Sequence, residues 1–334
     1  MDSAGSVRER LVQLLKDRGF VSGTEIGLRL GISRSAVWKH VRALREEGFA
    51  ILGSPRRGYR LADVPDTLSP PVVLPFLSGG FGKPYRYYPV TSSTNDRAKE
   101  LAQSGAPEGT VVVAEQQTGG RGRRGRSWHS PPGGLWFSLL LRPDVAPAET
   151  QTLPLLLSVA VARGIEEYLG LHPDLKWPND ILLGGRKAGG ILAEIGAETE
   201  RVHHVVAGIG LNVNIASFPP ELETTATSLQ IQWGGKISRA RLLGVLLAVI
   251  EEDYRRWCRT GFAPFHAAYQ KRCSFLGKEV AVVAAGGVLT GLAAGVDAAG
   301  RLLLSVPGGE VKRLSGGEVT VREEGAVAAG SGYR

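Results

Sequence analysis

The spacing of apolar residues predicts two helices at the start of the chain. Four apolar side chains recur at i, i+4, i+7 and i+8 and so share one face of a first helix: Val7, Leu11, Leu14 and Leu15. Ser22 and Glu25 then form a capping box, which predicts the start of a second helix, and Gly31 supplies a turn after it. The apolar anchors that we expect for this second helix and its turn are Leu28, Leu30 and Ile32.

A third helix and a hairpin carry the polar face of this stretch. Ser33 caps the helix, and its apolar face is formed by Val37, Val41 and Leu44. The residues at its start and on its opposite face suit contact with a major groove: Ser33, Arg34, Ser35, Trp38, Lys39 and Arg42. Two short apolar strands follow around a turn at Pro55–Gly58, with Arg56 and Arg57 at its tip, where they can meet phosphates.

These elements predict that residues 1–63 form a winged helix-turn-helix domain that binds DNA. Residues 1–62 hold 12 Lys and Arg against 6 Asp and Glu, while the whole chain has a formal net charge of +8, so most of the positive excess lies here. The alternative is a three-helix protein-interaction domain with a solvated basic face. The agreement of helices, hairpin and charge favours DNA.

Prolines mark the end of this domain. Asp63–Pro75 reads DVPDTLSPPVVLP, and prolines at this density break helices and strands, so residues 64–84 are predicted to be a linker. From Tyr85 onward, strand-like runs such as TVVVAE and LWFSLLL alternate with helical stretches near 94–104, 151–169 and 238–257. This alternation predicts an α+β domain with a mixed sheet over residues 85–275.

A loop rich in glycine and arginine, GGRGRRGRSWHSP, carries four guanidinium groups within six residues: Arg121, Arg123, Arg124 and Arg126. Gly120–Gly125 matches GxGxxG, but that dinucleotide motif must open a helix, and the PPGG of residues 131–134 prevents one. The sequence contains no Walker A motif. Guanidinium groups bind carboxylates and phosphates bidentately, so we favour a small anionic substrate with a nucleotide. The alternatives are a second DNA contact and a solvated basic loop.

Three later motifs supply further polar groups. KWPND places Lys176, Asn179 and Asp180 around a rigid Trp-Pro step, and Asp180 is a candidate to hold Mg²⁺. Lys187 precedes the small residues of AGG and is suited to neutralise charge on a carboxylate or an α-phosphate. In GIGLNVN, the amide of Asn212 is a candidate to read a base edge. The structural alternatives are a surface hairpin with scattered charges and a turn residue at a strand end.

The order and spacing of five motifs resemble those of biotin–protein ligases: SSTN (Ser92–Asn95), QQTGGRGRRGRSWHSP, KWPND, GRKAGGILAE and GIGLNVN. With the winged helix, nearly the whole chain resembles the bifunctional bacterial form, which is both biotin ligase and biotin-operon repressor. The resemblance implies a multidomain α+β protein. Its central mixed-sheet domain would be class II synthetase-like, and residues 276–324 would form an SH3-like β-barrel.

The same resemblance implies a reaction in two halves. Biotin and Mg-ATP give biotinyl-5′-AMP and pyrophosphate, and a lysine of the biotin carboxyl carrier protein then displaces AMP. The residues implied to bind biotin are Ser93, Thr94, Asn95, Gln117, Arg121, Gly122, Arg123 and Lys187, of which Lys187, Arg121 and Arg123 are implied to be catalytic. The residues implied to bind the nucleotide are Arg124, Asn179, Asp180 and Asn212, with Asp180 also near the metal.

The resemblance further implies a homodimer formed through the central sheet, with the adenylate as corepressor on operator DNA. The sequence departs from the family at one position. Some repressor-type members place a Trp against adenine where this chain has Ala226-Thr227-Ser228, although Trp233 is close by. This departure leaves the residue that stacks on adenine open.

Three other functions remain open at this stage. A lipoate–protein ligase shares the central fold, but GRGRRG followed by KWPND favours biotin. A biotin-sensing regulator without ligase activity is disfavoured because Lys187 and the arginine loop are retained. A ligase whose N-terminal domain no longer binds an operator is disfavoured by the basic face of the third helix.

The rest of the sequence adds constraints on class and compartment. After Gly277, short runs separated by glycine-rich turns predict a small barrel, and residues 325–334 are expected to be disordered. The two cysteines, Cys258 and Cys273, lie in no metal-binding spacing, which fits a reducing cytoplasm. Charges occupy the N-terminal MDSAGSVRERLVQ where a signal peptide needs an apolar stretch, and no apolar run is long enough to cross a membrane. We therefore expect a cytoplasmic protein that does not associate with membranes.

Overall fold

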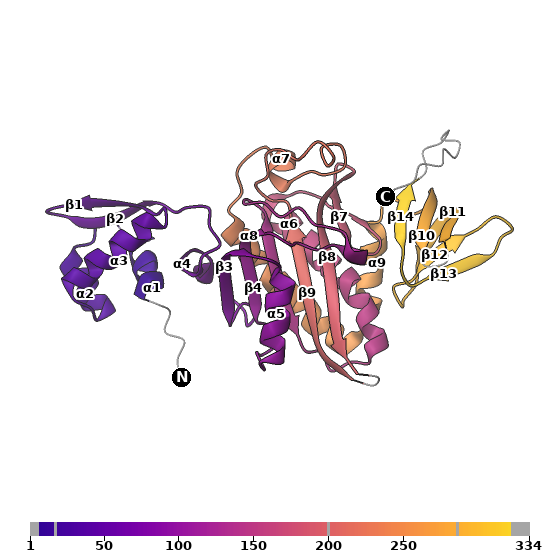
Figure 1. Ribbon diagram of the computed structural model, residues 1–334, viewed down its shortest axis with the longest axis horizontal. Helices are drawn as coiled ribbons and strands as arrows, with labels where there is room; N and C mark the ends of the chain where they lie inside the picture. The colour runs from indigo at the N-terminus through magenta and orange to yellow at the C-terminus, as the bar shows by residue number, and fades with distance from the viewer. Residues whose placement is uncertain (1–6, 17–18, 199–200, 285–286, 322–334) are drawn as a thin grey trace.

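The computed structural model describes residues 7–16, 19–198, 201–284 and 287–321 (Figure 1). Three parts follow one another along its longest axis. A small helical domain with a hairpin lies at the N-terminal end, a large sheet with helices occupies the middle, and a small sheet lies at the C-terminal end. The predicted tail at 325–334 lies outside the described residues.

The N-terminal domain has the predicted winged helix-turn-helix order. Its elements are α1 Val7–Lys16, α2 Gly23–Leu30, α3 Arg34–Glu46, β1 Ala50–Ser54 and β2 Gly58–Asp63. The side chain of Ser22 accepts a hydrogen bond from the Glu25 N–H, and Ser33 does the same for Ala36, so both predicted N-caps are confirmed. The prediction for Leu28 is wrong: this side chain is 81% exposed, because it lies on the outer face of α2, whereas Leu30 is buried.

The proline-rich segment is folded and packed. It contains the short helix α4 Pro70–Val73 and the 3₁₀ turn η1 Leu74–Phe76. We expected prolines to prevent helix here, but Pro70 occupies the first helical position, where a missing N–H costs nothing. Leu68 and Val73 are fully buried. The ammonium of Lys16, from α1, lies over the Phe76 ring, 4.3 Å from the ring centre. The segment therefore connects the first domain to the second through packed side chains.

The central domain is built on a seven-stranded sheet in the order β3-β4-β5-β9-β8-β7-β6. Its strands are β3 Tyr85–Thr91, β4 Val111–Gln117, β5 Leu135–Leu141, β6 Asp174–Lys176, β7 Asp180–Leu183, β8 Arg186–Ala197 and β9 Val202–Leu211. The pair β3–β4 is parallel and the remaining pairs are antiparallel, which confirms the predicted mixed sheet.

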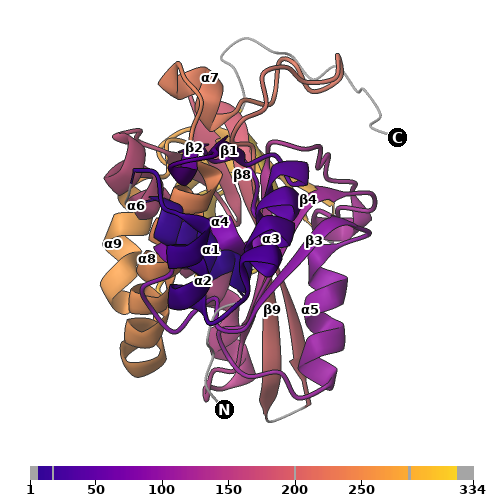
Figure 2. The same ribbon diagram turned by 90° about the vertical axis from the view of Figure 1, so that its left-hand side faces the viewer.

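Helices cover both faces of this sheet (Figure 2). α5 Thr94–Gln103 packs Ala98 and Ala102 against Val112, Leu140 and Val206 on one face. The other face is covered by α6 Leu153–Leu169, α8 Arg239–Thr260 and α9 Ala263–Lys271. Three short helical elements lie outside these layers: η2 Arg123–Gly125, η3 Pro147–Thr152 and α7 Leu229–Trp233.

The C-terminal domain is a five-stranded antiparallel sheet in the order β13-β12-β11-β10-β14. Its strands are β10 Glu279–Ala284, β11 Gly287–Val296, β12 Leu302–Ser305, β13 Val311–Leu314 and β14 Glu318–Val321. The indole N–H of Trp177, in the central domain, donates to the Gly300 carbonyl, so the two domains meet at the KWPND motif. Within the described residues, no helix combines the length and apolar character needed to span a bilayer.

Candidate functional site

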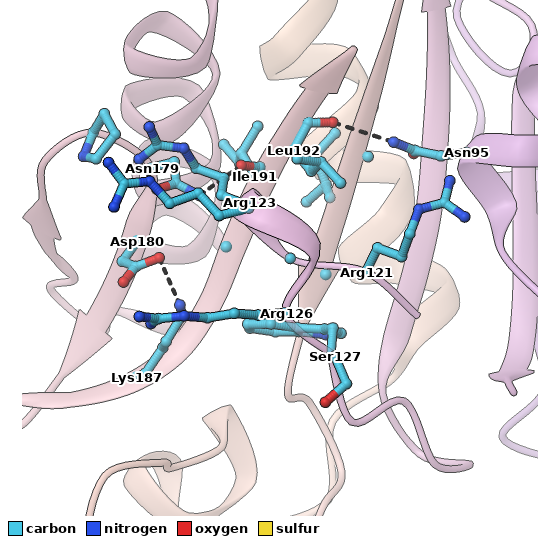
Figure 3. Close-up of a pocket in the computed structure, with 18 of the residues that line it drawn as sticks. Asn95, Arg121, Arg123, Arg126, Ser127, Asn179, Asp180, Lys187, Ile191 and Leu192 are labelled. Atoms are coloured by element: carbon cyan, nitrogen blue, oxygen red, sulfur yellow. Dashed lines mark hydrogen bonds and ion pairs between the residues drawn. The ribbon is translucent and has the colours of Figure 1, made fainter. Parts of the chain in front are cut away.

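One pocket gathers most of the polar motifs. It lies over strands β8 and β9, beside the start of α5, and the arginine loop crosses it (Figure 3). The predicted site residues that line it are Ser93, Thr94, Asn95, Gln117, Arg121, Gly122, Arg123, Arg124, Asn179, Asp180 and Lys187. Segments about 225 residues apart in sequence meet here, since Gly317 and Glu318 of the C-terminal domain also line the pocket.

The floor of the pocket carries a fixed hydrogen-bond network. The Thr94 N–H and hydroxyl both donate to Gln117 Oε1, at 2.8 and 3.1 Å, and Gln117 Nε2 donates to Ser130 Oγ at 3.0 Å. On the other side, Asn95 Nδ2 donates to Glu194 Oε2 at 2.6 Å. Each amide therefore has a defined orientation, so the floor can present donors and acceptors to a polar ring of a ligand.

Glycines on the central strands let these groups approach the sheet closely. A Cβ on Gly208 would lie 2.3 Å from Asn95 Oδ1, and one on Gly210 would lie 2.8 Å from Trp128 Nε1. Both distances are too short for a real Cβ contact, so any larger residue would displace Asn95 or Trp128. The GIG part of the GIGLNVN motif thus shapes the pocket floor.

Carboxylates hold the two ends of the arginine loop. Arg121 makes two hydrogen bonds to the Asp96 carboxylate, at 2.8 and 2.5 Å, and Arg126 pairs with Glu318 at 2.6 Å. The Arg121 guanidinium lowers the pKa of Asp96 from its ordinary value, because it stabilises the charged carboxylate. Arg124, between these ends, has a positive φ of 56°, which is unusual for a residue with a side chain.

Arg123 is the loop cation that is turned into the protein. Its guanidinium donates to the Gly317 carbonyl at 3.1 Å and to Asn179 Oδ1 at 3.5 Å. Burial and the nearby positive charge of Arg124 lower its pKa from the ordinary value. The hydrogen-bond partners of this cation are neutral, and a bound anion would compensate the cost of its burial.

Lys187 lies on the opposite wall. Its ammonium is 2.7 Å from Asp180 Oδ1 and lies over the Trp128 ring, 5.1 Å from the ring centre. Asp180 is the first residue of β7, and Lys187 lies in the facing strand β8, so the hairpin fixes their separation. The carboxylate and the indole together hold the ammonium at the wall of the pocket.

Asn212 is not among the residues that line the pocket, and its role in reading a base edge stays a prediction. Its side chain is 5% exposed, and Nδ2 donates to the Thr227 carbonyl at 3.0 Å. The reason is its position after β9, where the amide closes the connection to α7. Asn212 therefore fixes local backbone, as in the turn alternative.

Several lining residues were not predicted as site residues. They are Trp128, Trp177, Gly190, Gly317 and Glu318; two further residues, Ser138 and Glu194, hydrogen-bond Asn95 from outside the lining. Trp128 and Trp177 lie inside the quoted motifs, so the motifs themselves were a signal for them. No sequence signal marked Glu194 or Glu318, because the local sequence does not show which carboxylate faces an arginine.

The predicted DNA-contacting residues lie apart from this pocket. The described positions Arg34, Ser35, Trp38, Lys39 and Arg42 are exposed along α3, and Trp38 is 52% exposed. Ser33 uses its hydroxyl for the cap. In the wing, the turn residues Arg56 and Arg57 are exposed, and the Arg57 guanidinium stacks over Phe20 at 4.4 Å. Figure 2 views this end of the molecule directly, with α3 on its surface.

The described residues contain no group of three or more His, Cys, Asp or Glu side chains placed to hold a metal ion. Asp180 lines the pocket, and one carboxylate together with phosphate oxygens is a common environment for Mg²⁺. The site thus fits a metal ion that arrives with a nucleotide.

Comparison with known proteins agrees with this division. Residues 87–212 match the model of the biotin/lipoate A/B protein ligase family, residues 7–60 match a helix-turn-helix domain, and residues 275–322 match the biotin protein ligase C-terminal domain. A biotin protein ligase from Aquifex aeolicus, solved with biotin and ATP, is 32% identical with a TM-score of 0.63. That match covers 71% of this chain and 98% of the other.

Two relatives match along nearly their whole length. The bifunctional ligase/repressor BirA of Bacillus subtilis is 42% identical over 320 residues, covering 94% of this chain and 98% of the relative. The protein of the same description from Escherichia coli is 31% identical, covering 94% and 96%. The chain therefore belongs to the bifunctional ligase/repressor branch of the biotin/lipoate protein ligase family.

Proposed function

We propose that this chain is an ATP-dependent biotin–protein ligase that also represses transcription of biotin genes. It joins biotin to ATP, retains biotinyl-5′-AMP, and passes the biotinyl group to a lysine of a biotin carboxyl carrier protein. The observation that carries this proposal is that one pocket is lined by the cations Lys187 and Arg123 and by the polar floor formed by Thr94 and Gln117. That arrangement suits a ligand with a polar ring at one end and a carboxylate at the other.

In the first half-reaction, a carboxylate oxygen of biotin attacks the α-phosphorus of ATP and pyrophosphate leaves. Two anions must meet, so the main need is charge neutralisation and positioning rather than proton transfer. Lys187 and Arg123 are proposed to neutralise the carboxylate and the α-phosphate, and Arg121 to hold the loop closed through Asp96. Ser93, Thr94, Asn95, Gln117 and Gly122 are proposed to bind biotin.

The nucleotide is proposed to extend from Lys187 toward Arg124, Asn179 and Asp180, which line the same pocket. Mg²⁺ would be held by Asp180 together with the phosphates, and when bound it withdraws charge from the phosphate oxygens. Asp180 already orients Lys187, so its carboxylate would serve both cations.

In the second half-reaction, the neutral amine of the carrier lysine attacks the carbonyl carbon of the mixed anhydride, and AMP leaves with the bond electrons. The amine loses its proton as the amide forms. Until then the adenylate must be shielded from water. The contacts of Arg123 with Gly317 and of Arg126 with Glu318 place the arginine loop under the C-terminal domain, which supports this shielding role.

The repressor role is proposed for residues 1–63, with operator contacts from Arg34, Ser35, Trp38, Lys39 and Arg42 of α3 and Arg56 and Arg57 of the wing. The adenylate acts as corepressor by promoting a homodimer through the central sheet. We propose a cytoplasmic location, where both the carboxylase and the operator are found. The proposed boundaries are 1–63, a packed connector at 64–84, the catalytic domain at 85–275 and the C-terminal domain at 276–324.

The ligase is tested by incubating the full chain with biotin, Mg-ATP and a biotin carboxyl carrier domain, followed by mass analysis of the carrier. A gain of one biotinyl group is expected, with AMP and pyrophosphate as products. Replacing biotin by lipoate in a parallel reaction tests the other substrate of the family. No adenylate with biotin, or adenylate with lipoate alone, contradicts the proposal.

A further inference from the structure

A buried cluster of charges lies behind the pocket, at one end of the central strands. Its centre is Arg239, the first residue of α8, whose side chain is 2% exposed. Arg239 Nε donates to Asp66 Oδ1 at 3.0 Å, and its Nη1 lies 2.9 Å from Glu115 Oε2. Nη1 also donates to the Gly134 carbonyl at 2.9 Å, and Nη2 to the Asp66 carbonyl at 2.6 Å. A buried guanidinium with four such contacts has a single position available to it.

The partners of Arg239 belong to the elements that carry the pocket floor. Glu115 lies on β4, two residues before Gln117. Gly134 ends the segment that follows the arginine loop and directly precedes β5. Asp66 Oδ2 accepts from Asn214 Nδ2 at 2.8 Å, and Asn214 follows β9, the strand of Gly208 and Gly210. Arg239 thus contacts β4 and the residue before β5 directly, and it reaches the segment after β9 through Asp66.

The backbone beside Gly134 is unusually restricted. A Cβ on Gly134 would lie 1.9 Å from the Trp136 ring, and Gly133 has a φ of 96° with the Asn214 carbonyl 2.6 Å from an added Cβ. This segment leads back to Ser130 and Trp128, and the Gln117 N–H donates to the Ser130 carbonyl at 3.1 Å. A shift at Gly134 would therefore reach Gln117 and Trp128.

Residues 65–69, before the predicted catalytic domain begins, supply further contacts to the cluster, beside the Tyr87 hydroxyl, which donates to Glu115 Oε1 at 3.3 Å. Glu115 Oε1 accepts from Thr67 Oγ1 at 2.8 Å and from the Leu68 N–H at 2.6 Å. From here the chain enters α4 and η1, which pack on α1 of the winged helix and on α8. The segment that leaves the DNA-binding domain is thus bonded to the same carboxylate that Arg239 holds.

We propose that Arg239 is a positioning residue of the ligase and that residues 65–69 complete the biotin site through it. This inference rests on the proposed function. Arg239 does not line the pocket; it acts through Gly134 and Glu115, which set the places of Trp128 and Gln117. Weakening the cluster should raise the KM for biotin more than the KM for ATP, because Asn179 and Asp180, which are proposed to bind the nucleotide, are not among the residues that Arg239 contacts.

The test uses four variants of the full chain. Arg239→Lys keeps the charge and loses the fork, Asp66→Asn removes one carboxylate, and Asp66→Glu restores it. Asp253→Asn is the matched control: Asp253 is a buried carboxylate on the same helix, 7% exposed and 3.3 Å from Arg163, and it contacts none of the strand ends. For each variant, kcat and KM for biotin and ATP are measured in adenylate formation, together with thermal unfolding.

We expect Arg239→Lys and Asp66→Asn to raise the KM for biotin about tenfold or more, with Asp66→Glu recovering part of the loss. The KM for ATP should change by less than about threefold, and Asp253→Asn should leave both constants near wild type at a similar loss of thermal stability. A biotin KM within about twofold of wild type in Arg239→Lys and Asp66→Asn overturns the inference. Equal changes in the control variant also overturn it.

A second readout needs no substrate. Hydrogen exchange of the ligand-free chain should be faster in Asp66→Asn than in Asp253→Asn across residues 112–136. Unchanged exchange in that stretch overturns the inference, even if the kinetics change. A wild-type chain that forms no adenylate contradicts the proposed function instead, and the exchange result then still decides whether the cluster holds the pocket.

Discussion

At the scale of single residues, most of the charged side chains that line the pocket form ion pairs with other side chains of the protein. Arg121 is paired with Asp96, Lys187 with Asp180, and Arg126 with Glu318. A substrate carboxylate or phosphate must therefore share these cations with carboxylates of the protein. Arg123 differs from these three cations because its hydrogen-bond partners are neutral, so a bound anion would compensate the cost of its burial.

Lys187 is the residue whose loss should cost the reaction most. We predict that Lys187→Ala lowers the rate of adenylate formation by about 10²–10³, because one preorganised charge at the reacting centre is removed. The measurement is pyrophosphate release with biotin and Mg-ATP. The control is Lys236→Ala, which removes an exposed lysine by the same substitution. Equal rates for the two variants would remove Lys187 from the chemistry.

The Asp96–Arg121 pair predicts a pH dependence of stability. Since Arg121 holds the pKa of Asp96 below its ordinary value, the pair stabilises the fold above the unfolded-state pKa of about 4. This contribution is lost as the pH falls through the lower, folded-state pKa. Because both side chains are more than a third exposed, we expect Asp96→Asn to cost at most about 1 kcal/mol near pH 7.

The measurement for this pair is the free energy of unfolding in urea at several pH values. The difference between wild type and Asp96→Asn should shrink as the pH is lowered below about 4. A difference that grows toward acid would contradict the assignment of the pKa shift to Arg121.

The place of a residue in the pocket could be predicted where a motif contains it. Thr94, Gln117, Arg123 and Lys187 all line the pocket, and each lies inside one of the motifs quoted from the sequence. Asn212 lies outside the lining for a local reason: its amide donates to the Thr227 carbonyl, and sequence alone does not separate an amide that reads a base from one that closes a turn. Contacts such as Arg123 with Gly317 cross 194 positions, which no spacing rule reaches.

At the scale of elements, the arginine loop is held by the two structures it separates. Arg121 attaches it to α5, and Arg123 and Arg126 attach it to the segment before β14 and to its first residue. We predict that Arg123→Gly increases the rate of adenylate release by at least about tenfold, because a charged hydrogen bond is worth about 1.5–3 kcal/mol.

Arg123→Lys separates charge from geometry in this loop. It keeps a cation but cannot make two forked hydrogen bonds, so its release rate should lie between wild type and Arg123→Gly. The measurement is the appearance of free biotinyl-5′-AMP in the absence of carrier protein. An unchanged release rate in Arg123→Gly would show that the loop does not retain the intermediate.

Helices and strands with a clear apolar period were predicted to within a few residues, as for α5 and α8. Some of the short elements were missed. β6 has three residues, and α4 begins with two prolines in a segment that reads as a linker. Its helical form depends on Val72 and Val73, which are buried by packing between domains. Local sequence does not contain that information.

At the scale of the whole molecule, the pocket and the recognition helix α3 lie on different domains, joined by residues 64–84 (Figure 1). The connector packs against both domains: Lys16 of the first domain and Arg241 of the second both lie over the Phe76 ring. Such a connector limits the orientations that the DNA-binding domain can take relative to the sheet. A dimer formed through the central sheet would then present two recognition helices at a restricted spacing.

One chain presents one α3, while a helix-turn-helix repressor binds two half-sites about one helical turn apart. We therefore predict that biotin with Mg-ATP converts the chain from monomer to dimer, seen by sedimentation velocity over a range of concentrations. Lys187→Ala, which is expected to make little adenylate, should remain monomeric under the same conditions. It should dimerise when biotinyl-5′-AMP is supplied, at a higher concentration of biotinyl-5′-AMP than the wild-type chain needs. This pair of results separates a response to the adenylate from a response to biotin or ATP alone. A wild-type chain that stays monomeric at high concentration with saturating substrates would contradict the dimer, and operator binding would then have to proceed through single half-sites.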